Sequence, residues 1–153
     1  MQLSVKTELS ALELSAWRGF LRVHAAVLGE LDRELQDAHD LPLTAYEVLL
    51  FLEQARENRL RMSELAASLL LSQSGITRLV DRLEREGLVV RERCDSDGRG
   101  YYAVLTAEGR ARFAEARPTH LAGVRGHFLD RLSERDLARL ALAWDRILPG
   151  ASA

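Results

Sequence analysis

One stretch near the middle of the chain combines side chains that can hydrogen-bond to the bases and phosphates of DNA. It follows Ser72 and carries the polar residues Gln73, Ser74, Thr77, Arg78, Asp81 and Arg82. The apolar residues of the same stretch are Ile76, Leu79, Val80 and Leu83. Their spacing is that of an α-helix, so the polar residues share the opposite face. Amide, hydroxyl and guanidinium groups pair with base edges and phosphates, although an ordinary amphipathic helix is the alternative interpretation.

The start of this helix is suited to contact with phosphate. Ser72 is expected to cap it, while Ser74 and Gly75 leave little bulk in the first turn. The first N–H groups of a helix are unpaired and carry a partial positive charge, which attracts anions. We therefore count Ser72 and Ser74 among the candidate DNA-binding residues.

A β-hairpin is predicted directly behind this helix. After Gly87 the hydrophobic period changes from 3.6 to 2, and the segments 88–94 and 101–106 flank the loop DSDGRG. Arg99 stands between two glycines near the loop tip, where the backbone is thin. A guanidinium on so slim a support fits the narrow, electronegative minor groove. Asp97 can orient an arginine side chain through an ion pair.

A long amphipathic helix is predicted from Leu9 to His39. Its apolar face comprises Trp17, Phe20, Leu21, His24, Val27, Leu28, Leu31 and Leu35. Some thirty residues extend about 45 Å at about 1.5 Å per residue. A small domain cannot cover a stripe of that length, so we expect a second copy of the chain to cover part of it.

The remaining helices are predicted from their capping residues. Thr44 with Glu47 has the spacing of a capping box and starts a second helix, and Ser63 caps a short third one. Thr106 caps a helix that Pro118 should kink or interrupt. Ser133 with Asp136 three residues later caps the last helix, whose apolar stripe runs over residues 137–148.

Two helices joined by a tight turn and followed at once by a hairpin form the order of a winged helix-turn-helix. We predict a mainly α-helical fold with a small β-hairpin wing, as one domain over residues 1–153. The winged helix-turn-helix occupies 42–109, and dimerisation helices occupy 8–39 and 110–148.

Over about residues 8–148 the chain resembles the multiple antibiotic resistance regulator (MarR) family of bacterial transcription regulators. The resemblance rests on SELA at 63–66, TRLVDRLEREGLV in the next helix, Asp97 and Arg99 in the wing, and the junction 105–109. It implies a homodimer that binds a pseudo-palindromic DNA operator and is often released by a small ligand. Gly98 departs from the family, which often has a basic residue there.

The charge of the chain leaves a second function class open. The 153 residues carry a net charge of −2, but residues 1–60 account for −4, while 61–117 and 118–153 each carry +1. Local arginines must therefore neutralise phosphate. The alternative to a repressor is a winged-helix protein-interaction module without DNA binding.

Other function classes are excluded. No apolar run approaches the roughly 18 residues of a membrane span, and the N-terminus does not resemble a signal peptide, so we expect a cytoplasmic protein without a membrane partner. The single cysteine, Cys94, excludes an internal disulfide and is not expected to be a thiol sensor. Without a phosphate loop or a GxSxG motif, we expect neither an enzyme nor a cofactor.

A small-ligand pocket is a further hypothesis. Trp17, Phe20, His24 and Tyr46 could line it where the first and second helices meet, with core or dimer packing as the alternative.

The histidines raise the question of a metal site. They are His24, His39, His120 and His127. His120 and His127 share a helix face, but no third ligand is identifiable, so we expect no metal site.

Overall fold

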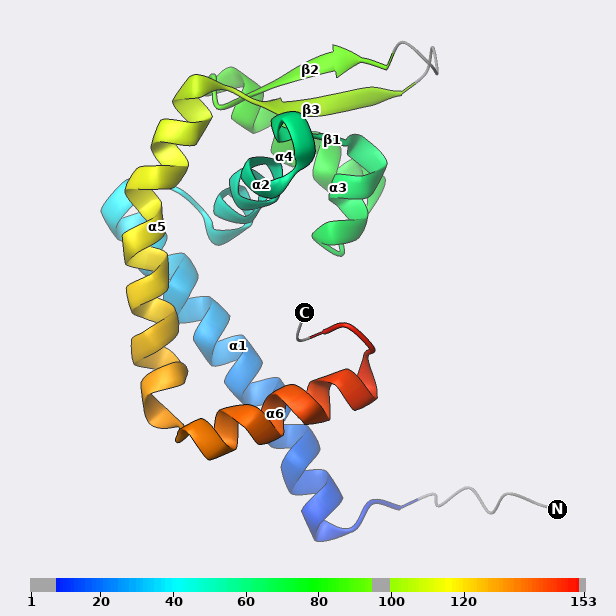
Figure 1. Cartoon of the computed structure of the whole chain (residues 1–153), viewed down its shortest axis with the longest axis vertical. Coiled ribbons are helices and arrows are strands. Elements are labelled where there is room, and N and C mark those ends of the chain that lie inside the picture. Colours follow the sequence, from blue (N-terminus) through cyan, green and yellow to red (C-terminus); the bar gives the residue numbers. More distant parts are fainter. Residues whose placement is uncertain (1–7, 95–99, 152–153) are drawn as a thin grey trace, which may run out of the picture.

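The computed structural model describes residues 8–94 and 100–151 (Figure 1). Its helices are α1 (Ala11–His39), α2 (Leu43–Gln54), α3 (Met62–Ser68), α4 (Gln73–Arg85), α5 (Ala107–His127) and α6 (Glu134–Ile147). Its strands are β1 (Arg59–Arg61), β2 (Val89–Arg93) and β3 (Tyr101–Leu105). Short 3-10 turns lie at Arg56–Asn58 and Leu129–Arg131. The winged-helix elements form one end of the molecule, α6 lies at the other, and α5 runs between them (Figure 1).

The core lies beneath the helix-turn-helix and is centred on α2. Tyr46, Val48, Leu49 and Leu52 are almost fully buried, because the apolar run of α2 faces neighbours on several sides. Helix α4 contributes Ile76, Val80 and Leu83, and the sheet contributes Val89 and Ala103. The buried face of α4 is the one that its apolar spacing predicts.

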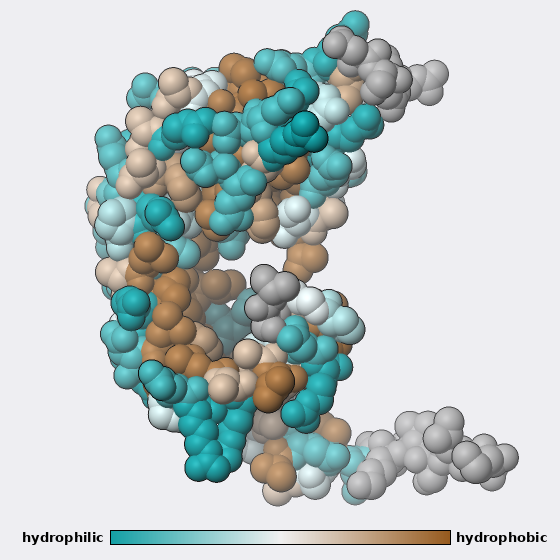
Figure 2. Space-filling view, in the orientation of Figure 1, coloured by the Kyte–Doolittle hydropathy of each residue, from teal (hydrophilic) through white to brown (hydrophobic). Residues whose placement is uncertain are grey.

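The apolar stripe of α1 is covered only at its C-terminal end. Leu35 is fully buried, whereas the Trp17 side of the stripe is open, with Trp17 53% exposed. Figure 2 shows hydrophobic atoms at the surface of the half of the molecule that holds α1, α5 and α6. None of the described helices is long and apolar enough to cross a membrane.

Three predicted helix caps are confirmed. Ser72 Oγ accepts a hydrogen bond from the Gly75 N–H at 3.1 Å, and Thr106 Oγ1 accepts one from the Gly109 N–H at 2.9 Å. Ser133 forms a capping box with Asp136. These caps depend on residues only three apart, which explains why sequence spacing suffices to find them.

Two predicted caps are wrong. Helix α2 begins at Leu43, before the Thr44–Glu47 pair, because Asp32 of α1 supplies the acceptor: the Leu43 N–H donates to Asp32 Oδ1 at 2.8 Å. Ser63 lies inside α3 rather than at its cap, since the cap residue is Arg61.

The hairpin is confirmed, but the sheet has a third strand. The strand order is β1-β3-β2, entirely antiparallel, and Arg59 of β1 lies opposite Val104 of β3. Three residues are too few to show an alternating pattern, so β1 is visible only through its pairing with a strand some forty residues later.

The interruption predicted at Pro118 is wrong, whereas the kink that was its alternative stays a prediction. Helix α5 continues through it to His127. Proline removes one hydrogen bond of the helix, but α5 packs along both α1 and α2, and Thr119 Oγ1 is 2.8 Å from His39 Nε2 at the end of α1. Tertiary contacts on either side of Pro118 therefore hold the helix together.

The first turn of α5 packs closely against the short segment that joins α4 to β2. A Cβ atom at Gly109 would overlap the carbonyl oxygen of Leu88 and approach Leu105 Cδ1 to 2.8 Å. Beside it, the Thr106 N–H donates to the same Leu88 oxygen at 3.2 Å, and Thr106 Oγ1 donates to the Gly87 carbonyl at 2.7 Å. Only glycine permits this close approach.

Gly109→Ala is expected to lower the free energy of unfolding by about 2 kcal/mol or more, because the overlap is with backbone that cannot move aside. Urea denaturation followed by circular dichroism measures the change. The matched control is Gly126→Ala in the same helix, where a Cβ meets nothing within 4 Å. Equal stability of the two variants would contradict the tight junction.

Candidate nucleic-acid interface

Helix α4 presents a polar face to solvent. Ser72, Gln73, Ser74, Thr77 and Arg78 are all exposed, whereas Arg82 is half-buried. The first turn holds no acidic residue, so the helix N-terminus is free of side chains that would repel phosphate. The structure thus brings six of the candidate DNA-binding residues together, five on α4 and Ser72 at its cap.

Local hydrogen bonds hold several of these side chains against the helix. Thr77 Oγ1 donates to the Gln73 carbonyl at 2.7 Å, so the hydroxyl hydrogen of Thr77 is already bonded within the helix. Ser72 and Ser74 share a hydrogen bond at 3.2 Å.

Arg82 differs from the others. Its Nε donates to Glu86 Oε1 at 2.8 Å, and this hydrogen bond raises the pKa of Arg82. Part of its charge is therefore neutralised within the chain, which leaves Arg78 as the more available cation of this face.

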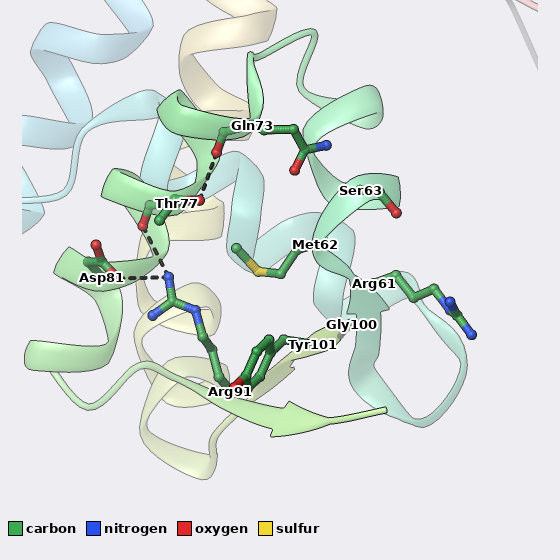
Figure 3. A pocket seen from close by; sticks show the side chains of 9 residues that line it. All are labelled: Arg61, Met62, Ser63, Gln73, Thr77, Asp81, Arg91, Gly100 and Tyr101. Atoms are coloured by element: carbon green, nitrogen blue, oxygen red, sulfur yellow. Dashed lines mark hydrogen bonds and ion pairs between the residues drawn. The ribbon is translucent and has the colours of Figure 1, made fainter. Parts of the chain in front are cut away.

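An arginine from the wing holds α4 in place. The Arg91 guanidinium of β2 pairs with Asp81 at 2.7 Å and donates to the Thr77 carbonyl at 3.2 Å (Figure 3). It also pairs with Glu84. The side chain is only 20% exposed. Arg91 therefore connects the wing to the turn of α4 that carries Thr77, although its position in a short strand gave no sequence signal of this role.

An open groove separates α4 from the start of α3 and the base of the wing (Figure 3). Gln73 and Thr77 line one side, while Arg61, Ser63 and Tyr101 line the other parts. Sequence reasoning missed Arg61 and Tyr101, because neither lies on the helix whose periodicity was informative. Their polar groups extend the candidate interface beyond α4.

Strands β2 and β3 of the wing are hydrogen-bonded to each other as far as the base of the loop that joins them. The Cys94 N–H donates to the Gly100 carbonyl at 2.9 Å, and a hydrogen bond with Tyr101 raises the pKa of Arg93. Asp97 and Arg99, the predicted residues of the wing tip, lie outside the described residues.

The four residues of the predicted ligand pocket lie in two places. Phe20 is 6.1 Å from both Trp17 and His24, and 5.7 Å from Trp144 of α6, measured between ring centroids. Tyr46 is instead buried in the core. The structure therefore does not bring Tyr46 to the other three.

The neighbours of Tyr46 are Phe113 and His120 of α5, with ring centroids 5.3 and 4.4 Å away. Burial raises the pKa of Tyr46 and lowers that of His120. The partly buried His120 ring stacks on the buried Tyr46 ring, an arrangement that core packing explains.

Replacing Arg91 with methionine tests the contact between the wing and α4. We expect the free energy of unfolding to fall by about 1–2 kcal/mol, because Asp81 and Glu84 lose their shared cation at a partly buried site. Chemical denaturation measures this change in the free energy of unfolding. Arg85→Met is the matched control on α4, since that side chain is exposed and is expected to change stability by less than about 0.5 kcal/mol. Similar losses would show that Arg91 has no special role.

The fold and the exposed face of α4 together define a winged helix-turn-helix protein. Comparison with known proteins agrees: the MarR family model matches residues 39–100. AbsC, a MarR family transcriptional regulator from Streptomyces coelicolor, is 37% identical with a TM-score of 0.87, over 93% of this chain and 95% of AbsC.

Two other known proteins are similar to this chain. Sco3205, a MarR family transcriptional regulator from Streptomyces coelicolor solved in complex with DNA, is 34% identical with a TM-score of 0.87, over 94% of this chain and 90% of that one. The transcriptional repressor YetL from Bacillus subtilis is 34% identical over 52% of this chain and 47% of YetL. The chain therefore belongs to the MarR family of transcriptional regulators. This confirms the predicted resemblance and fold class, and it places the protein among regulators rather than enzymes.

Proposed function

We propose that the protein is a homodimeric repressor that binds a pseudo-palindromic operator in double-stranded DNA and is released by a small ligand. The observation that carries the proposal is the exposed Gln73, Thr77 and Arg78 face of α4, beside a helix start without acidic residues. The DNA complex of Sco3205 and the repressor activity in the name of YetL support the same conclusion. Such a protein acts in the cytoplasm, where bacterial DNA lies.

The proposed contacts divide by chemistry. Gln73, Thr77 and Arg78 lie in the N-terminal part of α4, the part of a recognition helix that approaches base edges in the major groove. Ser72, Ser74 and Arg82 would contact phosphates through the helix N-terminus and through charge. Arg99, oriented by Asp97, would enter the minor groove beside them.

The proposed dimer rests on apolar side chains that the chain leaves uncovered. They are Leu9, Leu12, Trp17, Phe20 and Leu21 near the start of the chain, and Leu142, Ile147 and Leu148 near its end. A patch of this extent on the same half of the molecule is typical of an interface (Figure 2). Residues 8–39 and 110–148 would thus join two copies, and each copy would present its 42–109 unit to DNA. Two-fold symmetry then places two inverted half-sites about one helical turn apart.

The ligand that releases the operator is proposed to bind among aromatic rings. Trp17, Phe20 and His24 lie together with Trp144 and offer partly exposed ring faces, whereas Tyr46 is buried and is not part of this group.

Leu142→Asp is expected to give monomers, because a charge in an apolar interface is costly when it has no partner. The molar mass measured by light scattering at micromolar concentration should fall from about twice 17.2 kDa in the unchanged protein to 17.2 kDa in the variant. The control is Leu70→Asp: Leu70 is 92% exposed in the turn before α4, and Leu142 is 60% exposed on α6. A dimeric Leu142→Asp variant would place the interface elsewhere.

Single alanine replacements at Gln73, Thr77 and Arg78 test the reading of bases. Each is expected to weaken binding to the operator by about 1–3 kcal/mol and to change binding to random DNA very little. Fluorescence anisotropy titrations of both duplexes at one salt concentration measure this difference, with Arg85→Ala as the control on the same helix. Equal losses on both duplexes would assign the three residues to phosphate contact. If no promoter fragment binds at all, the protein is an interaction module instead.

A further inference from the structure

Three side chains suited to binding a metal ion meet where α5 crosses α1. Glu30 and Glu34 lie one turn apart on α1, and His127 lies in the last turn of α5. One ligand atom from each residue lies within 4.8 Å of the other two. We propose that Glu30, Glu34 and His127 bind one divalent transition-metal ion of the zinc class.

The fold brings together residues that the sequence separates. His127 Nε2 is 2.7 Å from Glu34 Oε1, although the two residues are 93 positions apart. Sequence reasoning sought a second ligand for His127 on its own helix, at His120. The partners are carboxylates of the facing helix, and an i,i+4 pair on one helix places both of them on the same face.

Gly123 makes room for this arrangement. A Cβ atom there would lie 2.5 Å from Glu34 Oε2 and 2.6 Å from Leu31 Cδ2. The Glu34 carboxylate therefore occupies the space that the missing side chain leaves, one turn of α5 before His127. The helices approach closely enough for both to contribute ligands to one ion.

The chemistry of the group fits a zinc-class ion. One imidazole nitrogen and two carboxylate oxygens form the mixed nitrogen and oxygen set that such ions accept, and three protein ligands leave a further position for water. The side chains of Glu34 and His127 are each 27% exposed and that of Glu30 is 47% exposed, so an ion can reach them.

The charges of the group also favour a cation. Arg33 pairs with Glu30 at 2.7 Å, but it also pairs with Asp37 at 3.2 Å, so its single charge is shared between two carboxylates. A divalent ion would balance the carboxylate charge of the two glutamates. A structural hydrogen bond between Glu34 and His127 without any ion is the alternative that the experiment must separate.

The experiment is a metal titration of the full-length protein without an affinity tag. Zinc is added in competition with a chromophoric chelator, and cobalt binding is followed by its visible absorption. We expect one ion per chain, and at least tenfold weaker binding in Glu30→Gln, Glu34→Gln and His127→Ala. Glu30→Gln is the variant that leaves the Glu34–His127 contact intact, so its loss of binding cannot be ascribed to a disturbed helix crossing.

Glu115→Gln is the control, because Glu115 is an exposed carboxylate of α5 outside this group. Circular dichroism of every variant shows that it is folded. Binding by Glu30→Gln and His127→Ala at wild-type strength, or no saturable binding of zinc or cobalt at micromolar concentration, would overturn the proposal and leave the cluster as a helix contact. None of these measurements involves DNA, so their outcome is independent of the proposed repressor function.

Discussion

The close contact between α5 and the Leu88 carbonyl is the constraint on which the winged helix-turn-helix end of the molecule depends. At this point Gly109 lies against the backbone, and Thr106 is hydrogen-bonded to Gly87 and Leu88. The end of α4, the start of the wing and the first turn of α5 are therefore joined within a few residues. Neither α4 nor the hairpin can move independently of α5 while these contacts hold.

Ion pairs neutralise the acidic side chains in α4 and at its C-terminal end. Asp81 and Glu84 are paired with Arg91, and Glu86 is paired with Arg82. The acidic residues of α4 thus serve to hold arginines and the wing in place, while the first turn carries none. Net charge is a poor guide to such a surface, because the sign of the field near DNA depends on where the unpaired charges lie.

Local patterns predicted most of the fold, and the errors follow from long-range contacts. The caps at Ser72, Thr106 and Ser133 and the buried face of α4 depend on residues within a turn or two, so spacing reveals them. The start of α2 depends on Asp32 in another helix. Strand β1 exists only because β3 pairs with it.

The candidate site shows the same division between local and long-range information. The exposed face of α4 was predictable from the spacing of its apolar residues. The hydrogen bond from Arg91 to α4 and the carboxylate neighbours of His127 arise instead from tertiary packing. Tyr46 was grouped with Trp17 by residue type and element order, but it packs on α5 instead.

Because α5 is continuous through Pro118, this one helix connects the two ends of the molecule, and a rotation at one end displaces the other. Its arm from Gly123 to the capping residue Thr106 is about 25 Å long at about 1.5 Å per residue. A change of about 10° in the angle at which α5 crosses α1 would displace the wing end by about 4 Å. That displacement exceeds the roughly 3.4 Å between successive base pairs of DNA, so in the proposed complex a rotation of this size would be enough to move the contacts of the winged helix by one base pair.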